Sequence, residues 1–159
     1  MRIKGIIAED FVNYKVPSLT IESPICKDFK CDRECGVQVC QNWSLAKAPI
    51  IDIPNFKILD LYFKSDITKA ICFQGLEPFD TFDDLWDFLL MFRCCGYEDD
   101  VVIYTGYKEE EIASKIKLLT KFKNIIIKFG RYIPDQEKHY DEVLGVELAS
   151  PNQYARRIS

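Results

Sequence analysis

The chain has 159 residues, of which 48% are hydrophobic and 29% charged, and its net charge is −4. This length and composition predict one soluble domain over residues 1–159. The acidic balance argues against nucleic-acid binding, which depends on a basic surface. No apolar run approaches the roughly 20 residues of a membrane span, and the N-terminal residues do not resemble a signal peptide. A cytoplasmic protein without a membrane partner is therefore expected.

The first half of the chain predicts a strand, a cysteine-rich loop and a helix, in that order. Residues 17–22 (PSLTIE) are typical of a strand, and the loop of residues 23–42 follows directly. Residues 55–64 predict a helix with three apolar residues on one face: Phe56, Leu59 and Phe63.

The next two elements are a strand and a longer helix. The apolar run AICFQG at residues 70–75 ends in glycine and suits a buried strand. Residues 80–93 predict a helix with acidic residues in its first turn. Four apolar residues recur in it at helical spacing: Leu85, Phe88, Leu89 and Phe92.

The same alternation continues over residues 101–130. VVIYTG at residues 101–106 and NIIIKFG at 124–130 predict strands, each ending in glycine. Residues 108–122 between them predict an amphipathic helix, with acids first and lysines last. Its inward residues are Ile112, Ile116 and Leu119.

Strands that alternate with helices predict an α/β fold with a mostly parallel sheet. The chain is too short for an eightfold barrel of roughly 250 residues, so a partial, open βα barrel is the better prediction. Function in such folds resides on loops beyond the carboxyl ends of the strands. Here these loops begin at Ser23, Gly75, Gly106 and Gly130.

The first of these loops holds four of the seven cysteines, namely Cys26, Cys31, Cys35 and Cys40. A reducing cytosol and an odd cysteine total argue against disulfides. Structural zinc sites usually combine two separated pairs of ligands, and no second Cys or His pair follows. Four soft thiolates in one loop favour an iron–sulfur cluster over zinc. Lys27, Lys30 and Arg33 either offset the negative charge of such a cluster or form a solvated basic loop.

The remaining cysteines do not suggest a second site. Cys72 lies in an apolar strand and is expected to be a small buried hydrophobic residue. Cys94 and Cys95 end an apolar helix and are interpreted as packing residues.

Five segments together resemble the radical S-adenosylmethionine superfamily, and more narrowly the activating proteins of anaerobic ribonucleotide reductases. Cys31-Asp-Arg-Glu-Cys35 with Cys40-Gln-Asn42 is similar to their Cys-x3-Cys-x2-Cys-x-Asn motif. Gly75-Leu-Glu-Pro78 resembles a Gly-Gly-Asp/Glu-Pro loop. The other three segments resemble conserved strand ends and the closing Ser-x-Asn-Gln: Tyr104-Thr-Gly-Tyr107, Lys128-Phe-Gly-Arg-Tyr132 and Ser150-Pro-Asn-Gln153.

Two departures bear on the site. The last two cysteines are four residues apart where the family has two, and Leu76 replaces the second glycine of the Gly-Gly motif. Cys26 is an additional thiol placed where the first family ligand sits. The cluster ligands are therefore 31/35/40, 26/31/35 or 26/31/40. The first set is preferred because Cys40-Gln-Asn best matches the third ligand.

The resemblance implies a 4Fe-4S cluster with one open iron, at which S-adenosylmethionine is cleaved reductively. It implies cofactor binding by Gly75, Glu77, Pro78, Thr105 and Tyr107, with Glu77 facing the methionine ammonium. The expected function is an oxidoreductase that generates a glycyl radical on a partner such as anaerobic ribonucleotide reductase. A flavodoxin- or ferredoxin-type electron donor is also implied. The alternatives are a non-catalytic iron–sulfur or zinc protein on the same fold, and a radical enzyme with another substrate.

Overall fold

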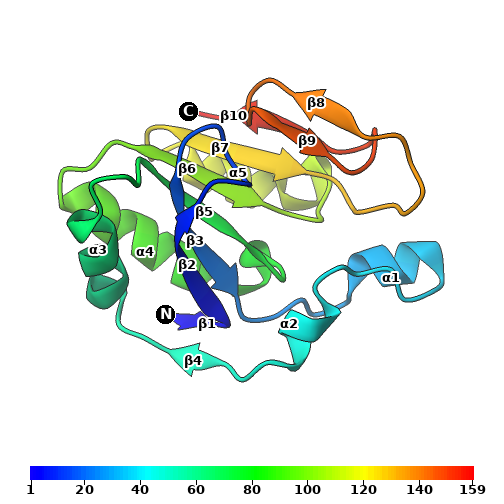
Figure 1. Cartoon of the computed structure of the whole chain (residues 1–159), viewed down its shortest axis with the longest axis horizontal. Helices are drawn as coiled ribbons and strands as arrows, with labels where there is room; N and C mark the ends of the chain where they lie inside the picture. The colour runs from blue at the N-terminus through cyan, green and yellow to red at the C-terminus, as the bar shows by residue number, and fades with distance from the viewer.

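A six-stranded sheet forms the centre of the computed structural model, which describes residues 1–159 (Figure 1). Its strand order is β10-β7-β6-β5-β3-β2. The four inner strands run parallel, while the two edge strands are antiparallel to their neighbours. The strands, in chain order, are β2 (Gly5–Asp10), β3 (Ser18–Ser23), β5 (Ala70–Gly75), β6 (Asp100–Tyr104), β7 (Ile125–Phe129) and β10 (Tyr154–Arg157). The prediction of a single α/β domain with a mostly parallel sheet is confirmed.

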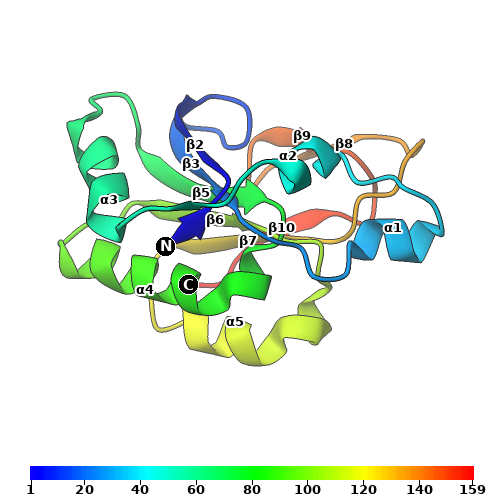
Figure 2. The ribbon, with the colours of Figure 1, turned by 90° about the horizontal axis from the view of Figure 1, so that it is seen from below.

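Three helices lie against one face of this sheet, as Figure 2 shows. They are α3 (Asn55–Lys64), α4 (Phe82–Cys94) and α5 (Ala113–Leu119). One-turn 3-10 helices, η1 (Pro78–Thr81) and η2 (Glu109–Ile112), precede α4 and α5. Alternate strand residues such as Ile71, Phe73 and Ile103 join the buried helix residues in the larger core cluster. Side chains of successive strand residues point to opposite faces, so the residues between them face away from the helices.

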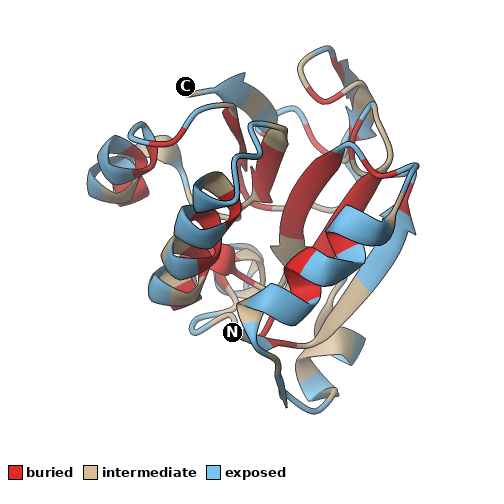
Figure 3. Cartoon of the chain, turned by 90° about the vertical axis from the view of Figure 1, so that its left-hand side faces the viewer, coloured by how far each residue is buried: buried red, intermediate tan, exposed pale blue.

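The opposite face of the sheet has a smaller core. Ala70, Cys72, Val102 and Ile126 pack there with Tyr14, Leu144 and Leu148. Figure 3 shows the inner strands of the sheet buried, whereas the helices expose their outer surfaces. The hairpin of β8 (His139–Asp141) and β9 (Val146–Leu148) covers part of this second face. The sheet is therefore apolar on both sides, as its continuous apolar strands predict.

The segment between β3 and α3 contains only short elements. These are α1 (Lys30–Cys35), α2 (Trp43–Lys47) and β4 (Ile51–Asp52), and β4 pairs with β1 (Arg2–Ile3). In Figure 1, α1 and α2 project beyond the end of the sheet to which the parallel strands point. None of the helices combines the length and the apolar character needed to cross a membrane.

Two packing predictions are wrong. Helix α3 buries Ile58, Leu59 and Tyr62, while Phe56 is 60% exposed and Phe63 39%. Both stripes of α3 are apolar, so spacing alone does not identify the inward one. Cys94 and Cys95 are exposed because they follow the last buried turn of α4. Cys72 is fully buried, as predicted.

Candidate functional site

A pocket of about 430 Å³ lies at the carboxyl ends of the parallel strands. Tyr104 and Lys128 line it, and their strand positions place them on the sheet face opposite the helices. The loops after β3, β5, β6 and β7, together with β9, complete its wall. This volume is in the range of small-molecule and cofactor sites. The four loops that the sequence singles out thus meet around one cavity.

Cys26, Cys31 and Cys40 all line this pocket. Cys35, the last residue of α1, does not line it. The pocket is therefore not lined by the preferred ligand set of Cys31, Cys35 and Cys40. It is lined by the third alternative set, Cys26, Cys31 and Cys40. Burial raises the pKa of the Cys26, Cys31 and Cys40 thiols above the ordinary value.

The carboxylate of Asp32 folds the second half of the cysteine loop. Its Oδ1 accepts hydrogen bonds from the backbone amides of Val39 and Cys40, at 2.8 and 2.7 Å. Its Oδ2 accepts a third from Nε1 of Trp43 at 2.7 Å. The Trp43 ring stacks on Phe29, with ring centroids 4.5 Å apart. These contacts turn the chain after α1 back toward the pocket and bring Cys40 to the same side as Cys31.

Arg131 connects the cysteine loop to the end of the sheet through an ion pair and hydrogen bonds. Its Nε lies 2.7 Å from Oε2 of Glu34 in α1. Its two terminal nitrogens donate to both carboxylate oxygens of Glu111, at 2.9 and 2.8 Å. The neighbouring backbone amide of Tyr132 donates to Sγ of Cys31 at 3.3 Å. Hydrogen bonds to a thiolate favour its charged form, so this amide supports Cys31 as a ligand.

Glu77 is the most deeply buried acid of the site, with 2% of its surface exposed. Its Oε1 accepts hydrogen bonds from Oγ1 of Thr105 at 2.8 Å and from the Phe79 amide at 3.1 Å. Its Oε2 accepts one from the Gly106 amide at 2.9 Å. Burial raises the pKa of Glu77 to about 7, although these three bonds act in the opposite direction. A cationic group that enters the pocket would therefore find a carboxylate ready to ionise.

Glu77 and Cys31 flank the same glycine. A Cβ atom built on Gly106 would lie 3.6 Å from Oε2 of Glu77 and 4.0 Å from Sγ of Cys31. The buried Lys128 also lines the pocket, and its Nζ donates to the Gly130 carbonyl at 3.2 Å. Burial lowers the pKa of Lys128 to about 8, with Cys31 and Glu77 opposing the shift. Thiols, a carboxylate and an ammonium thus share one partly dehydrated space.

The other residues expected at the cofactor divide into two groups. Gly75 and Thr105 line the pocket, and Leu76 lines it in the place of the expected second glycine. Pro78 and Tyr107 do not line it. Pro78 is buried as the first residue of η1, and the Tyr107 hydroxyl donates to Oδ1 of Asp80 at 2.7 Å. These two residues support the wall of the pocket from behind.

Sequence reasoning did not assign Lys128, Gln153 or the β9 segment to the site, although all of them line the pocket. The sequence does contain a signal for Lys128, since it is a lysine within an apolar strand, and a lysine is seldom buried without a role. The β9 segment carries no such signal, since its three residues are too few to show a strand pattern.

No group of three or more His, Cys, Asp or Glu side chains is arranged so that it could hold a metal ion. Comparisons with protein-family models, with curated proteins and with solved structures found no match to this chain.

Proposed function

We propose that this protein is a radical S-adenosylmethionine enzyme whose 4Fe-4S cluster is held by Cys26, Cys31 and Cys40. The observation that carries the proposal is the convergence of these three thiols with the buried carboxylate of Glu77 on one pocket. Three thiolates leave one iron of a cubane without a protein ligand. Such an iron is free to bind the amino and carboxylate groups of S-adenosylmethionine.

The chemistry of the donors and the volume of the pocket support this proposal. Thiolates are the usual ligands of iron–sulfur clusters, and the thiols surround a cavity of about 430 Å³. When bound, the cluster supplies the electron that splits the sulfonium into methionine and a 5′-deoxyadenosyl radical. The chain holds the thiols in place through Asp32 and Arg131 and keeps the space partly free of water.

Glu77 accepts a hydrogen bond from the amino group of the methionine moiety in this proposal. The carboxylate flanks Gly106 together with Cys31, so an amino group beside it is also beside the thiols that would hold the cluster. Thr105 fixes the carboxylate through its hydroxyl. A hydrogen bond from an N–H group to an ionised carboxylate is charge-assisted and strong in so buried a place. Tyr107 acts indirectly, because it contacts Asp80 rather than the pocket.

The sheet suits a protein substrate. Four parallel strands in sequential order, with helices on one face, support the proposal of a partial βα barrel that is open at its sides. We therefore propose that a glycine loop of a large partner, such as an anaerobic ribonucleotide reductase, completes the open side and loses a hydrogen atom there. A flavodoxin- or ferredoxin-type protein supplies the electron.

The test is anaerobic reconstitution with iron and sulfide, followed by reduction in the presence of S-adenosylmethionine. Wild type is expected to bind about four irons and to release 5′-deoxyadenosine and methionine. Cys26→Ala, Cys31→Ala and Cys40→Ala should each lose most of the iron and at least a hundredfold of the cleavage rate. Cys35→Ala is the matched control from the same loop and should retain both.

The outcomes separate the alternatives. A cluster without cleavage in wild type would favour a non-catalytic iron–sulfur protein, the reading that Leu76 supports. Stoichiometric zinc in place of iron would contradict the proposal altogether. Cleavage without any effect on a glycyl-radical partner would point to a different substrate. Loss of iron in Cys35→Ala but not in Cys26→Ala would restore the set 31, 35 and 40.

A further inference from the structure

Lys30 is a buried cation beside the thiols that no part of the proposed mechanism uses. Its side chain is 9% exposed and lines the pocket together with Cys26 and Cys31. Its Nζ has no hydrogen-bond partner. Its compensation comes from carboxylates at ion-pair distance, and a buried ion pair is weak evidence for a role in stability.

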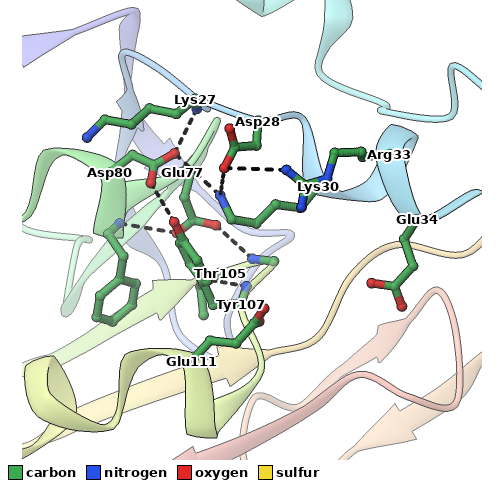
Figure 4. Close-up of polar contacts among 12 residues, drawn as sticks. Lys27, Asp28, Lys30, Arg33, Glu34, Glu77, Asp80, Thr105, Tyr107 and Glu111 are labelled. Atoms are coloured by element: carbon green, nitrogen blue, oxygen red, sulfur yellow. Dashed lines mark hydrogen bonds and ion pairs between the residues drawn. The ribbon is translucent and has the colours of Figure 1, made fainter.

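Two carboxylates lie within ion-pair distance of this ammonium but beyond hydrogen-bond distance. Oδ2 of Asp80 lies 3.7 Å from Nζ and Oδ2 of Asp28 lies 3.8 Å from it (Figure 4). The Tyr107 ring lies beneath, with Nζ 4.0 Å from the ring centroid. Asp80 is itself buried, with 3% of its side chain exposed. It accepts hydrogen bonds from the Tyr107 hydroxyl and the Lys27 amide, at 2.7 and 2.8 Å.

The surroundings of Lys30 suit a positive charge. Two carboxylates lie within 4 Å of its Nζ, and the face of the Tyr107 ring lies against it, a contact that attracts a cation. Lys30 thus lines the pocket with Cys26 and Cys31, and the buried carboxylate of Asp80 lies 3.7 Å from its ammonium, with little water to screen either charge.

We propose that Lys30 raises, and Asp80 lowers, the reduction potential of the cluster that Cys26, Cys31 and Cys40 hold. The inference rests on the proposed function. Reduction adds one electron to the cluster, taken from a reduced electron-carrier protein that is oxidised by one electron, and no bond in the chain forms or breaks. A nearby cation stabilises the added negative charge, and a nearby anion opposes it, more strongly in a buried site than in water.

Four variants form two matched pairs. Lys30→Met removes the buried cation, whereas Lys27→Met removes an exposed cation of the same loop. Asp80→Asn removes the buried anion, whereas Asp28→Asn removes one that is 51% exposed. The midpoint potential of each reconstituted protein is measured by electron paramagnetic resonance during a redox titration, without S-adenosylmethionine.

Lys30→Met should lower the equilibrium constant for reduction about tenfold, a shift of about 59 mV to more negative potential for one electron. Lys30→Arg should restore the wild-type value. Asp80→Asn should shift the potential in the opposite direction, and the two exposed variants should shift it far less. A merely structural role for Lys30 and Asp80 would not move the potential in opposite directions.

Equal potentials in Lys30→Met and Lys27→Met, or shifts of the same sign in Lys30→Met and Asp80→Asn, would overturn the inference. If Lys30→Met assembles no cluster, the comparison of Asp80→Asn with Asp28→Asn decides, and an unchanged potential there also overturns it. A wild type that binds no cluster refutes the proposed function as well. A cluster with unchanged potentials refutes only the role of these two residues.

Discussion

Glu77 connects the burial of the site with its chemistry. The carboxylate carries three hydrogen bonds from the chain and no cationic partner within ion-pair distance. Burial dominates and raises its pKa to about 7. This carboxylate accepts a hydrogen bond from a ligand amino group more readily as the pH rises through 7, because the ionised carboxylate is the stronger acceptor.

The raised pKa predicts a pH dependence of stability for the ligand-free protein. The folded state holds the Glu77 proton more tightly than the unfolded state, whose pKa is close to 4.5. The contribution of Glu77 to the free energy of unfolding is therefore complete below about pH 4.5 and is lost as the pH rises to about 7. The loss is of the order of 3 kcal/mol. Urea denaturation between pH 4 and 8 should show this slope in wild type and not in Glu77→Gln. If the free energy of unfolding changed with pH equally in wild type and in Glu77→Gln, the raised pKa of Glu77 would be contradicted.

At the residue scale, the sequence predicts part of the site. Glu77, Thr105 and Gly75 follow strand ends, and they do line the pocket or its wall. The choice among four cysteines depends on side-chain directions within a loop that has only one short helix, and spacing does not give them. Lys30 likewise reads as a solvated lysine, because nothing in CKDFKC shows that Asp80, 50 residues later, and Tyr107 enclose it.

At the scale of elements, the long periodic segments are predictable and the short ones are not. The four inner strands and the three packed helices agree with the apolar patterns of the sequence. The strands β1, β4, β8 and β9 have only two or three residues each, too few to show a period. The edge strand β10 has only four residues, again too few to show a period. Its Arg156 and Arg157 are 47% and 42% exposed and form ion pairs with Glu109 and Asp100.

Gly130, directly after β7, closely approaches the turn before β10 at the pocket. Its φ is +97°, and a Cβ atom there would lie 2.5 Å from the Asn152 carbonyl oxygen. Gly96 has a similar φ of +85° with nothing within 4 Å. Gly96→Ala should therefore destabilise the protein by about 1 kcal/mol, the cost of the left-handed backbone. Gly130→Ala should cost about 2 kcal/mol more, because backbone atoms must shift.

Thermal denaturation of the two glycine variants measures this difference. The Gly130→Ala variant should also bind S-adenosylmethionine more weakly, since Gly130 and Gln153 both line the pocket. Equal melting temperatures for the two variants would mean that the approach of Asn152 to Gly130 has no energetic importance.

At the scale of the whole molecule, the topology determines where chemistry is possible. Sequential parallel strands with helices on one face leave the other face free at the carboxyl ends. The β8–β9 hairpin covers only part of that face, and the pocket occupies the remainder. The alternation of strands and helices predicts this location. It does not predict the hairpin, whose packing against Tyr14 is a long-range contact.

The central claim is a cluster with one open iron, and electron paramagnetic resonance of the reduced, reconstituted protein tests it most directly. The account predicts a reduced-cubane signal that changes when S-adenosylmethionine is added, because the cofactor binds the open iron beside Glu77. The change should weaken in Glu77→Gln and persist in Cys35→Ala. A signal that is indifferent to the cofactor would mean a cluster closed by a fourth ligand, and would contradict the account.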